Sequence, residues 1–331
     1  MTDPQALLVV GHGTRSTAGV AEFTAFIDRL KRRTPTAFPA VEGGFIELSD
    51  PPVTDAAGAL ATTGHLDMVA VPLVLVAAGH GKGDIPAALL RETVRHPGMT
   101  YRYGRPLGPH PVLLDLVAAR VDATDDGTPR DDVHVLLVGR GSTDPDANAE
   151  ITKVARLLWE GRGWAGVETA FISLADPAVP AGLERLRRLG ARRIVVAPYF
   201  LFSGILPDRV VEQTRAYAAD HPELAVTVAD VIGDCEELAD LVEERYAEAI
   251  AGDIRMNCDT CVYRVALPGF GHRVGQPQRP HSHPADGAHD HGDHHGDHGD
   301  HGDHHGHDDH HHDHAPAAPQ AATPDSSLGR R

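Results

Sequence analysis

Residues 7–13 read Leu-Leu-Val-Val-Gly-His-Gly, and residues 135–141 read Val-Leu-Leu-Val-Gly-Arg-Gly. A second pair follows at nearly the same offset: Phe-Ile-Glu-Leu-Ser-Asp-Pro at 45–51 matches Phe-Ile-Ser-Leu-Ala-Asp-Pro at 171–177. Matched segments in the same order along the chain are typical of an internal duplication. The sequence therefore predicts two copies of one structural unit.

The second copy loses the side chains that could carry chemistry. His12 becomes Arg140, and Glu47 becomes Ser173. A third matched segment, 69–80, ends in a histidine that its copy lacks. Glycines, apolar runs and the Asp-Pro pair keep their places. This pattern predicts one working half and one degenerate half, because fold positions persist while reactive side chains disappear together.

The apolar runs predict buried strands of a parallel sheet, since both faces of such strands are covered by helices. They lie at 7–10, 69–76, 135–138 and 194–202. Between them, helical periodicity recurs at 18–33, 54–63, 111–121, 146–160, 178–189, 208–219 and 236–250. The alternation of strand and helix predicts an α/β protein made of two tandem doubly wound parallel-sheet domains.

Composition divides the chain into five parts. We expect an N-terminal catalytic domain at 1–122, a polar linker at 123–131 and a degenerate second domain at 132–251. A Cys-x-x-Cys segment at 252–275 follows. Residues 276–331 are rich in His, Asp, Gly and Pro, so we expect this tail to be disordered because it has too few apolar side chains to form a core.

Charge and hydropathy exclude several classes of protein. The 331 residues carry a formal net charge of −17, which argues against a nucleic-acid partner. No apolar run approaches the ~20 residues of a membrane-spanning helix. The first residues lack the basic and apolar regions of a secretory signal, and three cysteines are too few for a disulfide framework. We therefore expect a cytoplasmic protein without a membrane segment.

An anionic substrate would need basic side chains gathered in one place on this acidic chain. Such side chains do fall near predicted strand ends: Arg15, Lys82, Arg102, Arg105 and Arg140.

His12 and His80 each sit between two glycines after a predicted strand. Ligands of doubly wound sheets bind beyond the carboxyl ends of the strands, where both imidazoles and Glu47 would lie. Two imidazoles and one carboxylate form an open site for a first-row divalent metal, or accept protons. The alternative is that they are structural or surface residues. The glycine spacing fits neither a dinucleotide fingerprint nor a P-loop, which favours chemistry without ATP.

These motifs resemble the sirohydrochlorin chelatase family. The resemblance rests on Val-Gly-His-Gly-Thr-Arg at 10–15, the block at 45–51 and Pro-Leu-Val-Leu-Val-Ala-Ala-Gly-His at 72–80. The doubled length, with Val-Gly-Arg-Gly-Ser at 138–142, resembles the long two-domain cobaltochelatase type. It covers roughly residues 5–275.

The resemblance implies insertion of a divalent metal ion into sirohydrochlorin, a polycarboxylated tetrapyrrole, for cobalamin or siroheme synthesis. It favours Co²⁺, with Fe²⁺ as the alternative. His12, Glu47 and His80 would bind the metal and accept protons. The substrate's carboxylates would bind to a second set of residues, namely Thr14, Arg15, Lys82 and Arg140, since Arg pairs well with carboxylates.

Cys258 and Cys261 lie in a Met-x-Cys-x-x-Cys sequence, which in long members of this family is associated with an iron–sulfur cluster. A [4Fe-4S] cluster normally needs four Cys ligands, so a homodimer would share it, or Cys235 or another ligand would assist. Cys235 by itself is more typical of a buried small residue. A zinc ion shared across the dimer is the competing interpretation.

The tail holds fifteen of the 23 histidines between residues 281 and 314. Such density suggests a flexible sink for borderline metals. Its densest positions are His291, His294, His295, His304, His305, His310, His311 and His312. Two rival functions follow: a metal chaperone or storage protein that works through the tail, and a tetrapyrrole carrier without catalysis.

Overall fold

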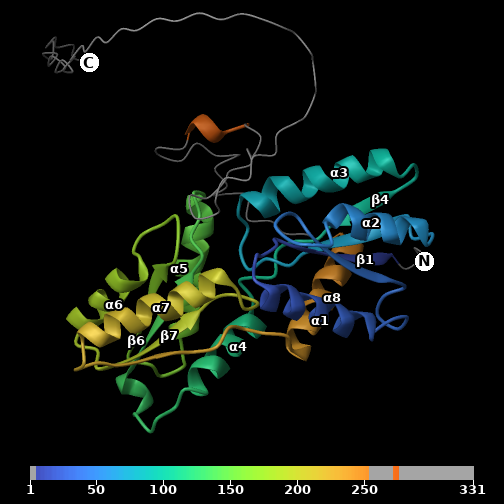
Figure 1. Cartoon of the computed structure of the whole chain (residues 1–331). Helices are drawn as coiled ribbons and strands as arrows, with labels where there is room; N and C mark the ends of the chain where they lie inside the picture. The colour runs from blue at the N-terminus through green and yellow to red at the C-terminus, as the bar shows by residue number, and fades with distance from the viewer. Residues whose placement is uncertain (1–4, 253–270, 276–331) are drawn as a thin grey trace, which may run out of the picture. The chain divides into compact units, whose positions relative to one another are not determined.

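The computed structural model describes residues 5–252 and 271–275 and contains two α/β lobes (Figure 1). The first lobe has a parallel sheet in the order β2-β1-β3-β4, and the second has the equivalent order β6-β5-β7-β8. The strands span β1 Ala6–Gly11, β2 Val41–Phe45, β3 Asp67–Pro72, β4 Thr100–Tyr103, β5 Val133–Gly139, β6 Gly166–Phe171, β7 Arg193–Pro198 and β8 Ala225–Val228. The predicted fold class and duplication are confirmed.

The helices lie close to the predicted segments, with one addition. They are α1 Thr17–Lys31, α2 Val53–Thr62, α3 Ile85–Arg95, α4 Pro111–Asp122, α5 Pro145–Trp159, α6 Val179–Arg188, α7 Ile205–Asp220 and α8 Glu236–Ala251. Helix α3 has no counterpart in the sequence prediction. Short turns of helix occur at His80–Asp84 (η1), Arg130–Asp132 and Gly271–Arg273.

Two of the predicted strands are longer than the observed ones. The runs at 69–76 and 194–202 leave their sheets after Pro72 and Pro198. Leu73 and Tyr199 still donate their backbone N–H groups to the neighbouring strand, and the chain then turns into a loop. The apolar residues beyond the prolines therefore belong to the loops at the carboxyl edges of the sheets.

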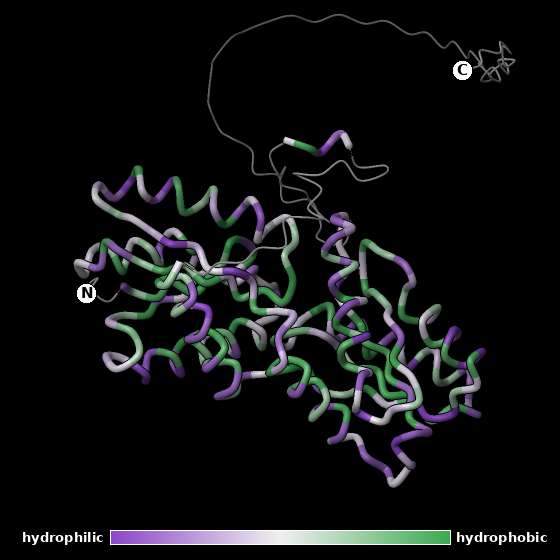
Figure 2. The backbone as a smooth tube through the Cα atoms, turned by 180° about the vertical axis from the view of Figure 1, so that it is seen from behind, coloured by the Kyte–Doolittle hydropathy of each residue, from purple (hydrophilic) through white to green (hydrophobic). Residues whose placement is uncertain are grey.

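Helices cover both faces of each sheet, as the alternation along the strands requires. In β1, Leu7 and Val9 lie in one core with α1, whereas Leu8 and Val10 lie in another with α2 and α3. The second sheet packs α5 on one face and α6 and α7 on the other. Figure 2 shows the hydrophobic residues concentrated along the inner strands and alternating with hydrophilic ones along the helices.

The two repeats exchange their last helices. Helix α4, from the first repeat, packs on β7 of the second sheet, and α8, from the second repeat, packs on β3 and β4 of the first. The Tyr246 hydroxyl of α8 donates to the Gln5 carbonyl ahead of β1. One hydrophobic core consequently runs through both lobes and includes residues of both sheets.

Arginines fasten α8 to the first lobe. Arg245 is fully buried and donates to the carbonyls of Pro106 and Leu107 at 3.1 and 2.8 Å. Arg105 pairs with Glu248 of α8 through two hydrogen bonds of 2.8 and 2.6 Å. Arg102 donates to the Ile250 carbonyl at 3.3 Å. Arg102 and Arg105, which lie near a strand end as expected, therefore hold a helix in this structure.

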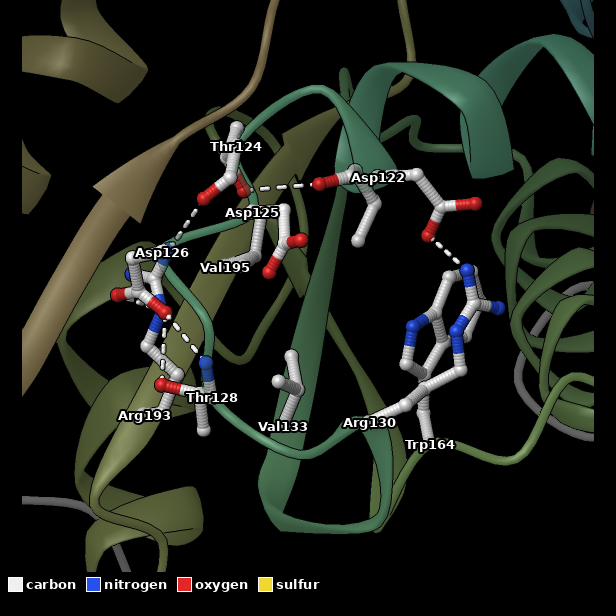
Figure 3. Close-up of a pocket in the computed structure, with 11 residues that line it drawn as sticks. Asp122, Thr124, Asp125, Asp126, Thr128, Arg130, Val133, Trp164, Arg193 and Val195 are labelled. Carbon is white, nitrogen blue, oxygen red and sulfur yellow. Dashed lines mark hydrogen bonds and ion pairs between the residues drawn. The ribbon is translucent and has the colours of Figure 1, made fainter.

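A hollow of about 300 Å³ lies beside the linker, at the amino ends of β5 and β7 (Figure 3). Both arginines that line it form ion pairs with aspartates of the same lining. Arg193 lies 2.9 Å from Asp126, and Arg130 pairs with Asp122. The ion pair and a bond from Arg193 to the Thr124 carbonyl fix the linker against the second sheet. This hollow is at the opposite edge from the histidine loops, so it is not the candidate site.

Loss of the buried Arg245 guanidinium should destabilise both lobes together. Arg245→Ala leaves the carbonyls of Pro106 and Leu107 without these donors and opens space under α8, so we expect a cost of about 2–4 kcal/mol. Urea unfolding should shift to lower concentration as one transition, because the core is shared. Arg188→Ala, at a mostly exposed position on α6, is the control and should leave the midpoint unchanged. Two separate transitions would contradict the shared core.

Candidate functional site at the facing strand ends

The carboxyl edges of the two sheets contact each other. Arg140, which follows β5, reaches His12, which follows β1, at 2.9 Å. The Ser203 N–H, after β7, donates to Glu22 of α1 at 2.8 Å. These contacts bring together the edges at which ligands bind in sheets of this kind.

Two glycines hold the equivalent loops of the repeats in the same conformation. Gly13 and Gly141 have φ angles of 105° and 84°, in the left-handed region. A Cβ on either would lie only 1.7 Å from the Glu47 carbonyl or 1.8 Å from the Ser173 carbonyl. Any larger residue would push these loops apart. The close approach explains why the glycines persist in both copies and places Glu47 beside His12.

The structure brings His12 and Glu47 together, with 3.7 Å between Nε2 and Oε1. Both side chains are partly exposed. The Arg140 guanidinium can only donate, and its Nη1 lies 2.9 Å from His12 Nε2. The distance from His12 to Glu47 is longer than that of a hydrogen bond. His12 therefore lies between a carboxylate of its own lobe and a guanidinium of the other.

Ser49 is a site residue that the sequence analysis missed. Its hydroxyl accepts the Thr14 N–H at 2.9 Å and donates to the Thr14 carbonyl. The intervening Leu48 has a φ of 66°, a conformation that costs roughly 1–2 kcal/mol for such a residue. The loop after His12 is thus tied to the loop that carries Glu47. The only sequence signal for the role of Ser49 is its replacement by Ala175 in the second copy.

The segment that carries His80 is anchored by the second lobe. His80 opens η1, a π-helical turn, and its side chain lies outside the described part of the structure. Within the same turn, Lys82 Nζ lies 2.7 Å from Asp144 and 3.2 Å from Asp146. The two carboxylates are buried, and the Lys82 side chain is only 9% exposed. Asp144 also caps α5. The predicted substrate-binding Lys82 therefore joins the two lobes in this structure.

A further acidic residue of α5, Glu150, supports the same segment. It accepts the Ala77 N–H at 3.3 Å and is almost fully buried. Burial raises the pKa of this carboxyl. The hydroxyl of Tyr199 is buried too, and burial likewise raises its pKa. This hydroxyl has no hydrogen-bond partner among the described residues. Asp144 at the cap of α5, together with Asp146 and Glu150 within it, thus contacts the loop before and within η1. No local sequence pattern predicts this role.

The remaining predicted residues lie on or near this edge, or outside the description. Arg15 is exposed on the loop before α1. Within residues 5–252 and 271–275, no group of three possible metal ligands comes together. The His80 side chain is not among the described ones. Cys258, Cys261 and the histidine-rich tail lie outside the described residues.

Known proteins resemble the chain over most of its length. The CbiX family profile matches residues 6–124 and again residues 134–249. A sirohydrochlorin cobaltochelatase of Priestia megaterium is 36% identical over 265 residues, covering 80% of this chain and 86% of that protein. A sirohydrochlorin ferrochelatase of the same organism is 32% identical, covering 72% and 88%. The structure of SirB from Bacillus subtilis with Fe³⁺ superposes with a TM-score of 0.66 at 29% identity, covering 76% and 97%.

Breaking the buried ion cluster should be costly. Lys82→Met leaves the Asp144 and Asp146 carboxylates without this cation, and we expect a loss of about 3 kcal/mol in the free energy of unfolding. Adding Asp144→Asn should recover part of that loss. Urea titrations of the wild type, both single variants and the double variant measure the coupling. Strict additivity of the two single effects would show that the pair does not interact.

Proposed function

The chain belongs to the CbiX family, and from this we propose that it inserts a divalent metal ion into sirohydrochlorin. The observation that carries the proposal is the pair of His12 and Glu47, whose Nε2 and Oε1 lie 3.7 Å apart at the carboxyl edge of the first sheet. Relatives with cobaltochelatase and ferrochelatase names support the same reaction. The metal is a substrate here, and the product is a metallated tetrapyrrole.

Metal insertion releases two pyrrole N–H protons as the ion enters the ring. His12 and His80 bind the metal ion and accept protons, a combination suited to neutral imidazoles near neutral pH. Glu47 adds a carboxylate next to His12. No nucleotide takes part, since the glycine loops lack the P-loop pattern.

The substrate's carboxylates need cationic and polar partners near these ligands. We assign this role to Thr14, Arg15, Lys82 and Arg140. Arg15 is exposed beside the His12 loop, and Arg140 contacts His12 itself, which supports the assignment. Lys82 also forms ion pairs with Asp144 and Asp146. We therefore assign it a second role, which is to position the turn that begins at His80.

Co²⁺ is our favoured metal, and Fe²⁺ is the alternative. The long two-domain form and the metal-binding tail favour cobalt and therefore cobalamin synthesis; iron would lead to siroheme. Imidazole and carboxylate ligands accept both ions. Insertion assays with purified sirohydrochlorin and each ion in turn, followed by visible absorption, decide between them.

The tail supports a second role in metal storage or delivery, because the same chain carries fifteen histidines there and consumes metal as a substrate. If the tail only supplies metal, deletion of residues 276–331 should keep turnover at saturating metal and lower it at limiting metal. A metal chaperone would lose its main binding capacity on the same deletion.

We propose a cytoplasmic location for the enzyme. None of the described helices meets the length and hydropathy that a membrane span requires.

Substitution of the proposed metal ligands should abolish most turnover. We expect His12→Ala and His80→Ala each to lower kcat about 100-fold or more, since each variant loses a ligand and a proton acceptor together. Glu47→Gln should also lower kcat, because it removes the carboxylate next to His12. Ser173→Ala, at the position equivalent to Glu47, is the matched control and should stay near wild type. Near-normal kcat in both histidine variants would refute the assignment.

Cys258 and Cys261 are proposed to bind a [4Fe-4S] cluster, or zinc, shared across a homodimer. The Met-x-Cys-x-x-Cys sequence supports this, because two thiolates fill half of a four-ligand site. Anaerobically purified protein should contain iron and sulfide and sediment as a dimer. The Cys258→Ser/Cys261→Ser variant should lose the chromophore and keep most insertion activity. A monomer with a complete cluster would refute sharing.

A further inference from the structure

Each lobe holds a loop of the other lobe through a glutamate at the same position of its repeat. The Ala77 N–H donates to Glu150 of α5 at 3.3 Å, and the Ser203 N–H donates to Glu22 of α1 at 2.8 Å. Each glutamate is the sixth residue of its helix, and each donor lies five residues after the proline that ends β3 or β7. The same contact is therefore made twice, once in each direction between the lobes.

The two loops differ in what they carry. The loop that Glu150 holds leads directly from Ala77 to His80 and η1. The loop that Glu22 holds leads from Ser203 to the start of α7, and it carries none of the proposed metal ligands. A contact that both repeats share thus lies next to a proposed ligand in one repeat alone.

Ion pairs add to the contact on the side of His80. Lys82 of η1 pairs with Asp144 and Asp146, which stand at the start of the helix that carries Glu150. The three corresponding positions of the reverse contact are Asp208, Ser16 and Ala18. These residues have no cation among them, so they cannot form the same cluster. The helix of the second repeat is thus better equipped to hold its partner loop than the equivalent helix of the first.

Burial also distinguishes the two contacts. Ala77 and Glu150 are each 8% exposed, whereas Ser203 and Glu22 are half-buried. A buried N–H that loses its acceptor pays the full cost of desolvation, while water can replace the acceptor of a half-buried one. Loss of the Glu150 carboxylate should therefore displace the loop at Ala77, and loss of Glu22 should disturb its own loop less.

Resting on the proposed function, we infer that Glu150 is a positioning residue for metal insertion, which fixes the loop leading to His80 from the other lobe. A displacement of a reacting group by about 1 Å is enough to lower a rate about 100-fold. The second repeat therefore contributes to the reaction by placing a ligand-bearing loop. Glu22, its equivalent in the first repeat, supports the contact between the lobes without this role.

The test compares insertion by full-length variants, with Co²⁺ and Fe²⁺ in turn at saturating concentration. Glu150→Met keeps the length of the side chain and removes the acceptor, so we expect kcat to fall about 10- to 100-fold while the KM for sirohydrochlorin changes little. Glu22→Met is the matched control and should stay close to the wild-type kcat. Glu150→Gln keeps an acceptor oxygen at the same reach and should restore most of kcat.

Hydrogen exchange of the same proteins, without metal or tetrapyrrole, separates this inference from the proposed function. Peptides covering 73–84 should exchange about 10-fold faster in Glu150→Met than in the wild type, and peptides covering 199–206 should change only in Glu22→Met. If Glu150→Met does not fold, Glu150→Asp, which keeps the charge and shortens the reach, serves in its place.

Three results would overturn the inference: equal losses of kcat in Glu150→Met and Glu22→Met, a wild-type kcat in Glu150→Met despite faster exchange at 73–84, or a Glu150→Gln variant as slow as Glu150→Met. A wild-type protein that inserts neither ion would refute the proposed function instead, since the exchange of residues 73–84 does not depend on turnover.

Discussion

The exchange of α4 and α8 between the repeats is the constraint on which the site depends. Each sheet is covered by the last helix of the other repeat, and buried groups such as Arg245 hold that helix in place. The lobes therefore share a core and cannot turn independently without breaking it. This fixes the carboxyl edges against each other, and it brings Arg140 to His12 although 128 residues separate them.

The two repeats share their backbone conformation but differ in the side chains at equivalent positions. Gly13 and Gly141 share their left-handed conformation, and Leu48 and Leu174 share theirs, with φ angles of 66° and 61°. The reactive side chains were kept in the first copy alone. The second copy supplies support instead: carboxylates of α5 grip the turn that begins at His80, and Arg140 binds His12. The second lobe thereby holds the loops that carry the proposed ligands His12 and His80.

Much of this could be predicted from the sequence, because buried strands, glycine loops and repeated motifs leave local signals. The edge strands left none: β2 contains two glycines, and β4 reads Thr-Tyr-Arg-Tyr with its side chains only partly buried or exposed. The helix exchange was equally hidden, since a helix periodicity does not tell which sheet it covers. Lys82 was expected to meet the substrate, and its contact with Asp144 depends on packing between lobes that no local pattern encodes.

The central claim is that the metal ion binds at His12, at the carboxyl edge of the first sheet. Anomalous scattering at the cobalt edge, from crystals of the full chain with Co²⁺, tests it most directly. The account predicts cobalt within coordination distance of His12. Cobalt bound at the equivalent loop of the second lobe, with none at His12, would contradict it.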